Sequence, residues 1–589
     1  MEIKRELERI LAGIYESVAA RERWGVATIE VRLENPPSLE QGDFATALPL
    51  RLAPTLKRAP LEIASRLLSE AQQDEALLAI ATPSMASPGF LNLRLRDEAL
   101  KDALNSEAKL PAGSLASAPT IVIDYSSPNV AKPMGVGHLR STIIGDSLKR
   151  IYCALGWKVV GVNHLGDWGT QMGKLLVAFK RQRGMSNNKF LMSNVDIAEL
   201  LKLYVQFHKE AEKHPELEEQ AKLEAKKLQD GDKENRLLWK RFTAASYKEF
   251  REIYKRLGVR IESWKGESAY QPKLAAIVKN ALDLSIAQHS EGAVVISFGE
   301  TMAPWVLQKQ DGAYLYTTTD LAALRYRLKT YHPEKILYVV GNEQTLHFEQ
   351  FRHAAEMLGY SPKEKIVHVK FGLVSFEGKK LSTRAGRSID LSQVLDEAVK
   401  RASDILKDRE MTKRQRARVA EIVGIGALKY HDLVQGRTHD IAFDWDRALS
   451  LTGNSAPYLQ YVVVRINSIL RKSKILSTKS KSNPKSKTTV TGYRLQVTGW
   501  RLAPTERELL RRMLKFQEVV EAAAASYEPH RIAEYLYQLA GSFNRFYETT
   551  PVLDAAELER SNRLLLIARV ANTLQTGLHL LGIEVPERM

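Results

Sequence analysis

The sequence is poor in cysteine: its 589 residues include only Cys153. An internal disulfide is therefore excluded, and so is a zinc site built from several cysteines. Cys153 lies in IYCALGW, which has helical spacing, so we expect a small buried hydrophobic residue rather than a nucleophile. No metal-ligand spacing occurs elsewhere, so we expect no resident metal ion.

The sequence also lacks a long apolar run. IVGIGAL, which starts at Ile422, is among the longest, and it is far shorter than the roughly 18 residues that cross a bilayer. The N-terminal segment MEIKRELERI alternates charged and apolar residues and has no signal-peptide core. These absences predict a cytoplasmic protein without a membrane partner.

What the sequence has in excess is positive charge, with 86 Lys and Arg against 69 Asp and Glu and a net charge of +17. Each neutralised phosphate releases condensed counterions, so a basic protein tends to bind polyanions. Anionic membranes and nucleic acids both fit this charge, and nucleic acid is modestly favoured. The length predicts three or more domains.

Residues 1–112 have the pattern of a small α+β domain. We expect an N-terminal helix, a strand in TIEVRLENP (28–36), a helix in LEIASRLLSEA (61–71) and a strand in GFLNLRL (89–95). KLPAGSLASAPT (109–120) is rich in Pro, Gly, Ser and Ala and is typical of a linker. We therefore place the first domain boundary there.

Residues 118–395 have the alternation of an α/β domain. The β-branched run IVIDY (121–125) predicts a buried strand, followed by a turn, a helix and a parallel strand in KVVGVNHLG (158–166). Lys, Glu, Leu and Ala at helical spacing predict a helical insertion at about 185–265. VVISF, ILYVVG and IVHVKFGLVSF are expected to resume the same sheet.

Almost everything after residue 390 has helical spacing. We expect a helical connecting region at 396–450 and an α-helical domain at 451–589. The basic, Ser-rich tract KSKILSTKSKSNPKSKTTV, with its lysine-rich segment 472–487, predicts an exposed loop. This loop either adds non-specific RNA affinity or is simply solvated.

GVGH, at 135–138, begins the helix that follows the first strand of the α/β domain. Unpaired backbone N–H groups and the positive end of the helix dipole favour a phosphate at such a place. Gly135 and Gly137 allow close backbone approach, and His138 can donate a hydrogen bond. Taken alone, these residues favour a simple glycine-rich turn with a surface histidine.

The surrounding residues reverse that interpretation. SSPNVAKPM and GHLRSTIIGD resemble the signature around the HIGH motif of class I aminoacyl-tRNA synthetases, in the form found in arginyl-tRNA synthetases. NHLGDWGTQMG, DGAYLYTTTDLAA, QTLHF and GKKLSTRAG are similar to further segments of that family, in the same order. The resemblance implies a multidomain α/β and α fold. Its parts would be a Rossmann-type catalytic domain with the helical insertion, a small N-terminal α+β tRNA-binding domain and a C-terminal α-helical anticodon-binding bundle.

The resemblance also implies a reaction: ATP-dependent activation of L-arginine to arginyl-adenylate and transfer to the 3′-terminal adenosine of tRNA(Arg), giving AMP and pyrophosphate. In this family the first step usually needs bound tRNA. Mg²⁺ would enter with ATP, held mainly by phosphates and water, and no zinc or organic cofactor is implied. We expect a monomer.

The segment KLSTR resembles the mobile second signature of the KMSKS type, whose cations neutralise phosphate charge during attack on the α-phosphorus. It supplies Lys380, Ser382 and Arg384; a solvated basic hairpin is the alternative. Lys132 matches a lysine that compensates for a degenerate second signature in some members. Gly135 stands where the family normally has histidine.

The remaining site residues follow from the same resemblance. A guanidinium group is best bound by carboxylates, and Asp124 and Asp320 match the acidic arginine-binding positions. Tyr316 shares a face with Asp320 if their segment is helical; a helix cap and a core aromatic are the alternatives. The implied arginine-binding residues are Asp124, Ser127, Asn129, Tyr316, Asp320 and Gln344. The implied ATP-binding residues are Met134, Gly135, Gly137, His138, Gly166, Asp167, His347 and Lys380, and the implied catalytic residues are His138, Lys132, Lys380, Ser382 and Arg384.

Both ends of the chain resemble tRNA-binding domains of the family. In NPPSLEQGDFATALPL, Phe44 can stack on an unpaired base of the tRNA elbow and Gln41 can read its edge, unless Phe44 is buried. Ala47 stands where asparagine is usual. Candidates near the anticodon are Tyr458, Tyr461, Phe543 and Asn544, although aromatic residues at helical spacing are more often core.

Two other hypotheses stay open at this point. Gly135 favours a non-catalytic tRNA-binding paralogue, whereas retention of His138, Lys132 and Lys380 opposes it. The second hypothesis is a synthetase for another amino acid, above all lysine, or another nucleotidylyltransferase. The paired carboxylates Asp124 and Asp320 favour a cationic substrate.

Overall fold

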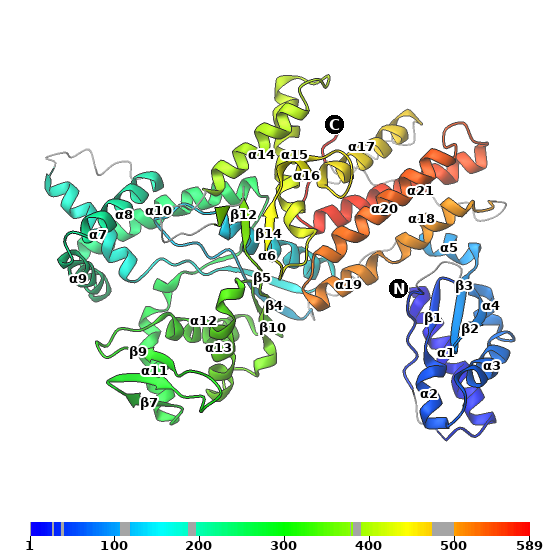
Figure 1. The fold of residues 1–589 in the computed structure, drawn as a ribbon, viewed down its shortest axis with the longest axis horizontal. Helices are drawn as coiled ribbons and strands as arrows, with labels where there is room; N and C mark the ends of the chain where they lie inside the picture. The colour runs from blue at the N-terminus through cyan, green and yellow to red at the C-terminus, as the bar shows by residue number, and fades with distance from the viewer. Residues whose placement is uncertain are drawn as a thin grey trace. The chain divides into compact units, whose positions relative to one another are not determined.

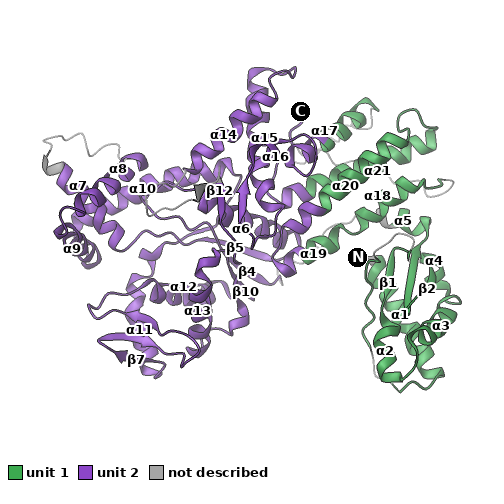
Figure 2. Ribbon diagram, in the orientation of Figure 1, with its two compact units in different colours: residues 1–110, 462–522, 535–576 green, residues 111–461, 523–534, 577–589 purple. Residues whose placement is uncertain are grey.

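The computed structural model describes residues 2–25, 29–36, 41–105, 118–185, 196–376, 379–380, 390–473 and 500–589 (Figure 1). These residues form two compact units (Figure 2). Unit 1 comprises residues 1–110, 462–522 and 535–576, and unit 2 comprises residues 111–461, 523–534 and 577–589. None of the helices in the described part of the chain has the length and apolar character of a membrane span.

The N-terminal part of unit 1 is an α+β structure. Its elements are α1 (Glu2–Arg21), β1 (Phe44–Thr46), α2 (Leu48–Leu56), α3 (Pro60–Ala71), α4 (Glu75–Ile80), β2 (Ala81–Ala86), β3 (Phe90–Leu95) and α5 (Asp97–Asn105). The strands form an antiparallel sheet in the order β1-β3-β2. The strand expected in TIEVRLENP is wrong: in residues 29–36 only Glu34 forms a β-bridge, to Ala45, and the backbone N–H of Leu33 donates instead to the Glu8 carboxylate.

The remainder of unit 1 is helical, as the sequence predicts. It contains α18 (Pro504–Leu514) and most of α17 (Ala456–Lys472), α20 (His530–Thr549) and α21 (Glu557–Leu580), with the first half of α19 (Phe516–Ser526). Arg507 on α18 lies 2.9 Å from Asp43 and also pairs with Asp97, and the buried Lys101 donates to the carbonyl oxygen of Trp500. These bonds join the α+β part to α18.

Unit 2 is built on a five-stranded parallel sheet in the order β11-β10-β4-β5-β6. The strands are β4 (Thr120–Asp124), β5 (Lys158–Asn163), β6 (Ser263–Trp264), β10 (Lys335–Tyr338) and β11 (Ile366–His368). The chain leaves β4 toward β5 and β6 on one side and places β10 and β11 on the other. Ligands of such sheets bind at the carboxyl ends of the strands where the order reverses, which here lies between β4 and β10.

Helix α6 (Gly137–Ala154) connects β4 to β5 and is buried along most of its length. The prediction that Cys153 is buried is wrong, because this side chain is exposed. The buried face of the last turns passes through Leu148, Ile151 and Tyr152, and Cys153 is rotated about 100° beyond Tyr152.

The segment between β5 and β6 is helical, with α7 (Thr170–Met185), α8 (Ile197–Ala211), α9 (Glu216–Asp230) and α10 (Lys233–Arg256). These helices share an apolar cluster that includes Leu175, Leu200, Phe207 and Phe242. The cluster gives the insertion a core of its own beside the sheet.

Two further sheets correct the expectation that VVISF and IVHVKFGLVSF resume the parallel sheet. VVISF forms β8 (Ala293–Ile296) in an antiparallel sheet with β7 (Ala287–Ser290) and β9 (Trp305–Gln308). Glu291 and Gly292 both have positive φ, which makes the two-residue turn of an antiparallel hairpin. Only the first part of the second segment, β11, joins the parallel sheet, since β12 (Val374–Phe376) pairs with β13 (Lys379–Lys380) and β14 (Ile441–Phe443).

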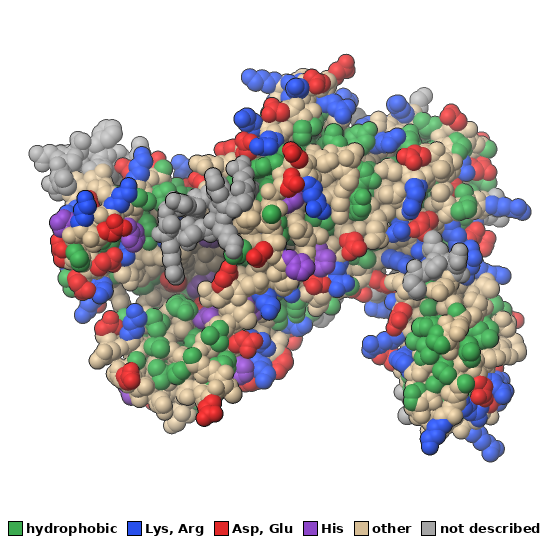
Figure 3. All heavy atoms as spheres, in the orientation of Figure 1, with side chains coloured by type: hydrophobic (Ala, Val, Ile, Leu, Met, Phe, Trp, Pro, Cys, Tyr) green, Lys and Arg blue, Asp and Glu red, His purple; other side chains and the backbone are tan. Residues whose placement is uncertain are grey.

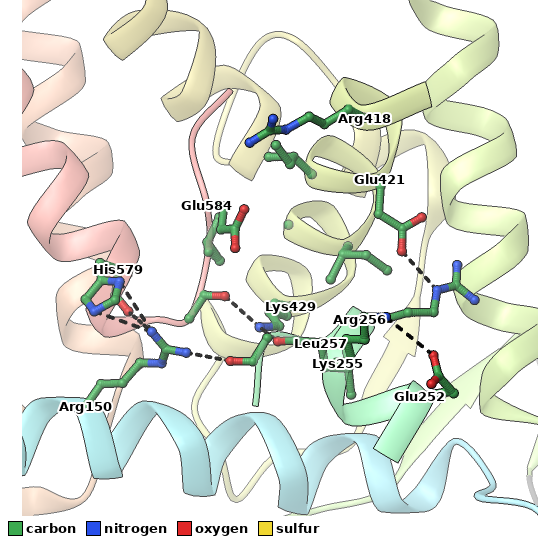
Figure 4. A pocket seen from close by; sticks show the side chains of 16 residues that line it. Arg150, Glu252, Lys255, Arg256, Leu257, Arg418, Glu421, Lys429, His579 and Glu584 are labelled. Carbon is green, nitrogen blue, oxygen red and sulfur yellow. Dashed lines mark hydrogen bonds and ion pairs between the residues drawn. The ribbon is translucent and has the colours of Figure 1, made fainter. Parts of the chain in front are cut away.

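The other helices of unit 2 are α11 (Leu274–Asp283), α12 (Tyr316–Tyr331), α13 (Thr345–Met357), α14 (Leu391–Ile405), α15 (Lys413–Leu433) and α16 (Trp445–Leu449). The C-terminal residues after α21 are irregular but fixed by side chains, since Lys429 donates to the carbonyl of Gly582 at 2.6 Å and Gln460 to that of Glu584 at 2.7 Å. A cavity of about 480 Å³ lies between this segment, α10 and α15 (Figure 4). Most of the predicted linker and nearly all of the predicted basic loop lie outside the described residues.

Candidate active site

The loop after β4 has an unusual backbone. Ser126, Ser127 and Ala131 have φ values of 74°, 46° and 65°, which non-glycine residues adopt only when their surroundings hold them there. The N–H of Ser126 donates to Oγ of Ser141 at 2.8 Å, and that of Ser127 donates to Oδ1 of Asn163 at 3.0 Å. This strain lies at the carboxyl end of β4, where the sheet topology predicts a ligand.

The loop ends at an open helix N-terminus. Gly137 begins α6, is exposed and has no heavy atom within 4 Å of the position of a Cβ. Nδ1 of His138 lies 3.2 Å from the carbonyl oxygen of Gly135, and burial lowers the pKa of His138. A neutral imidazole with one nitrogen occupied by this carbonyl keeps its other nitrogen for a ligand.

The residues just before His138 contact the segment that follows the second signature. Met134 is buried, and its carbonyl oxygen accepts from the N–H of Leu391 at 2.8 Å. Gly135 is buried and forms an antiparallel bridge with Asp390. Of the second signature itself, the backbone of Lys380 pairs with Ser375, whereas the Lys380 side chain and the residues Ser382 and Arg384 lie outside the described residues.

Asp124, at the end of β4, already has a guanidinium partner within the chain. Nη2 of Arg327 lies 2.6 Å from Oδ2 of Asp124, and Oγ of Ser127 donates to Oδ1 at 3.0 Å. Both charged side chains are buried. The structure therefore brings together the predicted residues Asp124 and Ser127, but with Arg327 in the place where a substrate group was expected.

Asp320 and Tyr316 share a face of α12, as their spacing predicts. Oδ2 of Asp320 lies 2.8 Å from Nε2 of His347, and the ring of Tyr316 lies 5.0 Å from the ring of His347. Tyr316 is 57% exposed, so it is a surface aromatic rather than a core one. His347, predicted to bind ATP, thus lies beside the predicted arginine-binding residues.

Glu267 is a residue that the sequence did not single out. It follows the carboxyl end of β6, and its pKa is raised to about 8 by burial and by the charges of Asp320 and Asp167. No Lys or Arg pairs with Glu267 or Asp320 in the part of the chain that the structure describes. Its position just past a parallel strand is the signal that could have found it.

Of the remaining residues predicted to bind ATP or arginine, some are engaged in contacts within the protein and others have exposed side chains. Both oxygens of Asp167 accept from Ser268, at 2.9 Å from its N–H and 2.6 Å from its Oγ. Gly166 lies against Asn129, because a Cβ at Gly166 would come within 2.0 Å of the Asn129 amide oxygen. Asn129 and Gln344 are exposed, and Gln344 lies in the short helix η5 (Asn342–Gln344) just before α13.

The predicted tRNA-binding residues are also divided. Phe44 on β1 is 6% exposed and Phe543 on α20 is fully buried against Phe546 and Tyr547, so both rings are core residues. Accessible side chains are those of Gln41 and Tyr461, with Tyr458 and Asn544 partly buried. On the face drawn in Figure 3, Lys and Arg side chains are intermingled with Asp and Glu. The net positive charge is therefore not gathered into one stripe on that face.

Among the described residues, no group of three or more His, Cys, Asp or Glu side chains is arranged to hold a metal ion. The groups at the carboxyl edge of the sheet are instead the N-terminus of α6 with His138, and the carboxylates Asp124, Asp320 and Glu267. Such an arrangement can bind an anionic phosphate chain and a cationic side chain next to each other.

Comparison with known proteins agrees with this geometry. Three family models match the chain: the arginyl tRNA synthetase N terminal domain over residues 1–95, the catalytic domain of class I tRNA synthetases (R) over 99–445 and the DALR anticodon binding domain over 459–589. The arginine–tRNA ligase of Fusobacterium nucleatum is 40% identical over 510 residues, 86% of each chain. That of Alkaliphilus metalliredigens is 36% identical over 590 residues, which cover 100% of both chains.

A solved structure, that of Thermus thermophilus arginyl-tRNA synthetase, superposes with a TM-score of 0.78 at 26% identity and covers 100% of both chains. The predicted fold class is confirmed: an N-terminal α+β domain, a catalytic domain with a parallel sheet and a C-terminal helical domain. The chain belongs to the arginyl-tRNA synthetase family of class I aminoacyl-tRNA synthetases.

Proposed function

We propose that this protein is an arginine–tRNA ligase that uses ATP. The carboxylate of L-arginine attacks the α-phosphorus of ATP, pyrophosphate leaves and arginyl-adenylate forms. A ribose hydroxyl of the 3′-terminal adenosine of tRNA(Arg) then attacks the activated carbonyl, and AMP leaves. The main support for the proposal is the pair of carboxylates Asp320 and Glu267. Neither has a Lys or Arg partner among the described residues. Both lie near the sheet edge that carries the strained signature loop.

Asp320 and Glu267 together bind the guanidinium group of arginine. A half-buried carboxylate pair is unfavourable until a cation arrives, and guanidinium offers N–H groups to two acceptors at once. The exposed ring of Tyr316 covers the side chain, and the amides of Asn129 and Gln344 hold the α-amino and carboxylate end. Asp124 stabilises the base of the arginine site through its hydrogen bond with Ser127 and its ion pair with Arg327.

ATP binds over the N-terminus of α6. The backbone at Met134, Gly135 and Gly137 approaches the nucleotide. Nδ1–H of His138 donates to the carbonyl oxygen of Gly135, so its Nε2 accepts a hydrogen bond from a hydroxyl or amino group of the nucleotide. Lys132, Lys380 and Arg384, with Ser382, balance the charge that develops on the phosphates. Mg²⁺ enters as part of the ATP complex and is held mainly by phosphate oxygens and water.

The tRNA is bound through the exposed candidates Gln41 and Tyr461 and the partly buried Tyr458 and Asn544, because a base can reach these side chains without unfolding a core. Stacking on Phe44 or Phe543 is not part of the proposal, since both rings are buried. The cytoplasmic location and the monomeric state stay predictions from the sequence.

The test is ATP–pyrophosphate exchange with purified full-length protein. Exchange should require arginine and should rise strongly when tRNA(Arg) is added. Exchange with lysine in place of arginine would overturn the substrate assignment. No exchange with any amino acid in the presence of tRNA would instead identify a tRNA-binding protein that has lost activation.

A further inference from the structure

The loop that carries Lys132 is built into the helical insertion. Val130 and Ala131, the two residues before it, are buried in the apolar cluster of α7 to α10. The N–H of Ala131 donates to the buried Oγ of Ser246 on α10 at 2.8 Å. Because Ala131 has a φ of 65°, these contacts hold a backbone conformation that an alanine does not adopt by itself. The insertion therefore fixes the position of the backbone that carries Lys132.

The insertion also holds the Lys132 side chain. Nζ of Lys132 lies 4.3 Å from the centroid of the Tyr204 ring on α8. The Tyr204 ring packs against His208, one turn further along α8, with 4.6 Å between ring centroids. No carboxylate forms an ion pair with Lys132 in the described ranges of the chain. The face of the Tyr204 ring is thus the group that compensates the ammonium charge.

The electrostatics around Lys132 favour an incoming anion. Burial lowers the pKa of Lys132, and the charge of Lys174 lowers it further. Lys174 is paired with Glu218 at 2.8 Å, whereas Lys132 has only the ring. A partly desolvated ammonium without a counter-anion gains more from a phosphate than a solvated one does.

We propose that Tyr204 is a positioning residue for ATP: its ring holds the ammonium group of Lys132 where it contacts the phosphates, so the helical insertion completes the nucleotide site. This inference rests on the proposed use of ATP and goes beyond it by assigning a task to the insertion. Tyr204 acts through Lys132 and does not itself touch the nucleotide.

Substitution of the ring tests the proposal. Tyr204→Leu should raise the KM for ATP in the exchange reaction about threefold to tenfold, the value of one partly desolvated cation–π contact, and leave the KM for arginine unchanged. Tyr204→Phe keeps the ring face and should behave like the wild type. Phe179→Leu is the matched control, because Phe179 packs on Phe242 within the same core and should lower thermal stability without changing the KM for ATP. A shift of the ATP KM in this control equal to that of Tyr204→Leu would overturn the proposal.

A double-mutant cycle separates positioning from general support of the fold. Lys132→Ala should weaken ATP binding, measured by calorimetry, and Tyr204→Leu added to Lys132→Ala should change it no further. Additive losses would overturn the proposal. This readout needs no arginine, so it is independent of the exchange assay: absent exchange in the wild type contradicts the proposed function, whereas absent coupling in ATP affinity contradicts the role of Tyr204.

Discussion

Nη2 of Arg327 lies 2.6 Å from Oδ2 of Asp124, with 1% and 8% of the two side chains exposed. Asp124 is the acidic residue at the end of the strand that precedes the signature loop, so an internal guanidinium occupies a carboxylate next to the substrate site. We infer that the substrate is bound by nearby carboxylates that no internal Lys or Arg engages, such as Asp320 and Glu267.

Replacing Arg327 by Met should lower the free energy of unfolding by about 3–5 kcal/mol, because Asp124 would be left buried without a counter-charge. Urea unfolding followed by tryptophan fluorescence measures the change. The double variant with Asp124→Asn should recover part of the loss, since it removes the unpaired charge. An unfolding midpoint of Arg327→Met equal to that of the wild type would show that solvent reaches Asp124.

Asp320→Asn should raise the KM for arginine about tenfold to a hundredfold, the value of a charge-assisted hydrogen bond to a guanidinium group, and change the KM for ATP little. Exchange kinetics with each substrate varied in turn measure both constants. Glu262→Gln is the control, because this carboxylate lies next to β6 but pairs with Lys149. Equal increases in both KM values for Asp320→Asn would make Asp320 a structural residue.

Arginine affinity should rise with pH between about 6.5 and 8. The pKa of Glu267 is raised to about 8 by burial and by Asp320 and Asp167, so the free protein holds a proton there at neutral pH. A guanidinium group needs the carboxylate form, so binding releases this proton and is favoured as pH rises, by about tenfold to twentyfold over this range. Calorimetry in buffers of different ionisation enthalpy detects the proton. Glu267→Gln should bind arginine more weakly, and the dependence should be absent.

Gly135→His should lower the rate of exchange by about tenfold or more, although histidine is usual at this position in the family. Gly135 is buried and bridged to Asp390, next to the bond between Met134 and Leu391, so a large side chain must displace this backbone. Gly13→Ala, on α1, is the control for folding, because a Cβ at Gly13 meets no atom within 4 Å and Gly13 is not part of the nucleotide site. A faster Gly135→His enzyme would show that glycine limits the reaction.

The sequence predicted elements whose own pattern decides their structure. β4 and α6 lie where the run IVIDY and the following helical spacing put them, because burial on both faces of a parallel strand and of its connecting helix leaves a local signature. The prediction for VVISF was wrong because the pattern of a strand does not specify its partner. The turn at Glu291 and Gly292, directly before β8, pairs it with β7 instead of with the parallel sheet. The prediction for Cys153 was wrong because a shift of one residue along a helix moves a side chain by about 100° around it, from the buried face to the exposed one.

In the candidate site, too, only contacts within one element could be predicted from the sequence. The spacing of Tyr316 and Asp320 was enough to place them on one face of α12, because both belong to one helix. The pairing of Asp124 with Arg327 could not be predicted from the sequence, because the two residues are far apart in the chain and only the fold brings the end of β4 to the later part of α12. Glu267 was missed because a single carboxylate in a turn has no pattern until the strand order places it at the ligand edge.

Lys429 holds the C-terminal segment through its side chain (Figure 4). Lys429 is buried, its Nζ donates to the carbonyl oxygens of Leu257 and Gly582, and burial lowers its pKa to about 8. Lys429→Met fills the same space but leaves both carbonyls without this donor, and each buried unpaired carbonyl costs about 1–3 kcal/mol. Removing the buried charge offsets part of that cost, so we expect a net loss of about 2–4 kcal/mol in the free energy of unfolding. Lys255→Met is the matched control: its side chain is 80% exposed, and its loss should change stability by about 0.5 kcal/mol or less. Equal unfolding curves for the two variants would mean that the C-terminal backbone is held by Gln460 and apolar contacts alone.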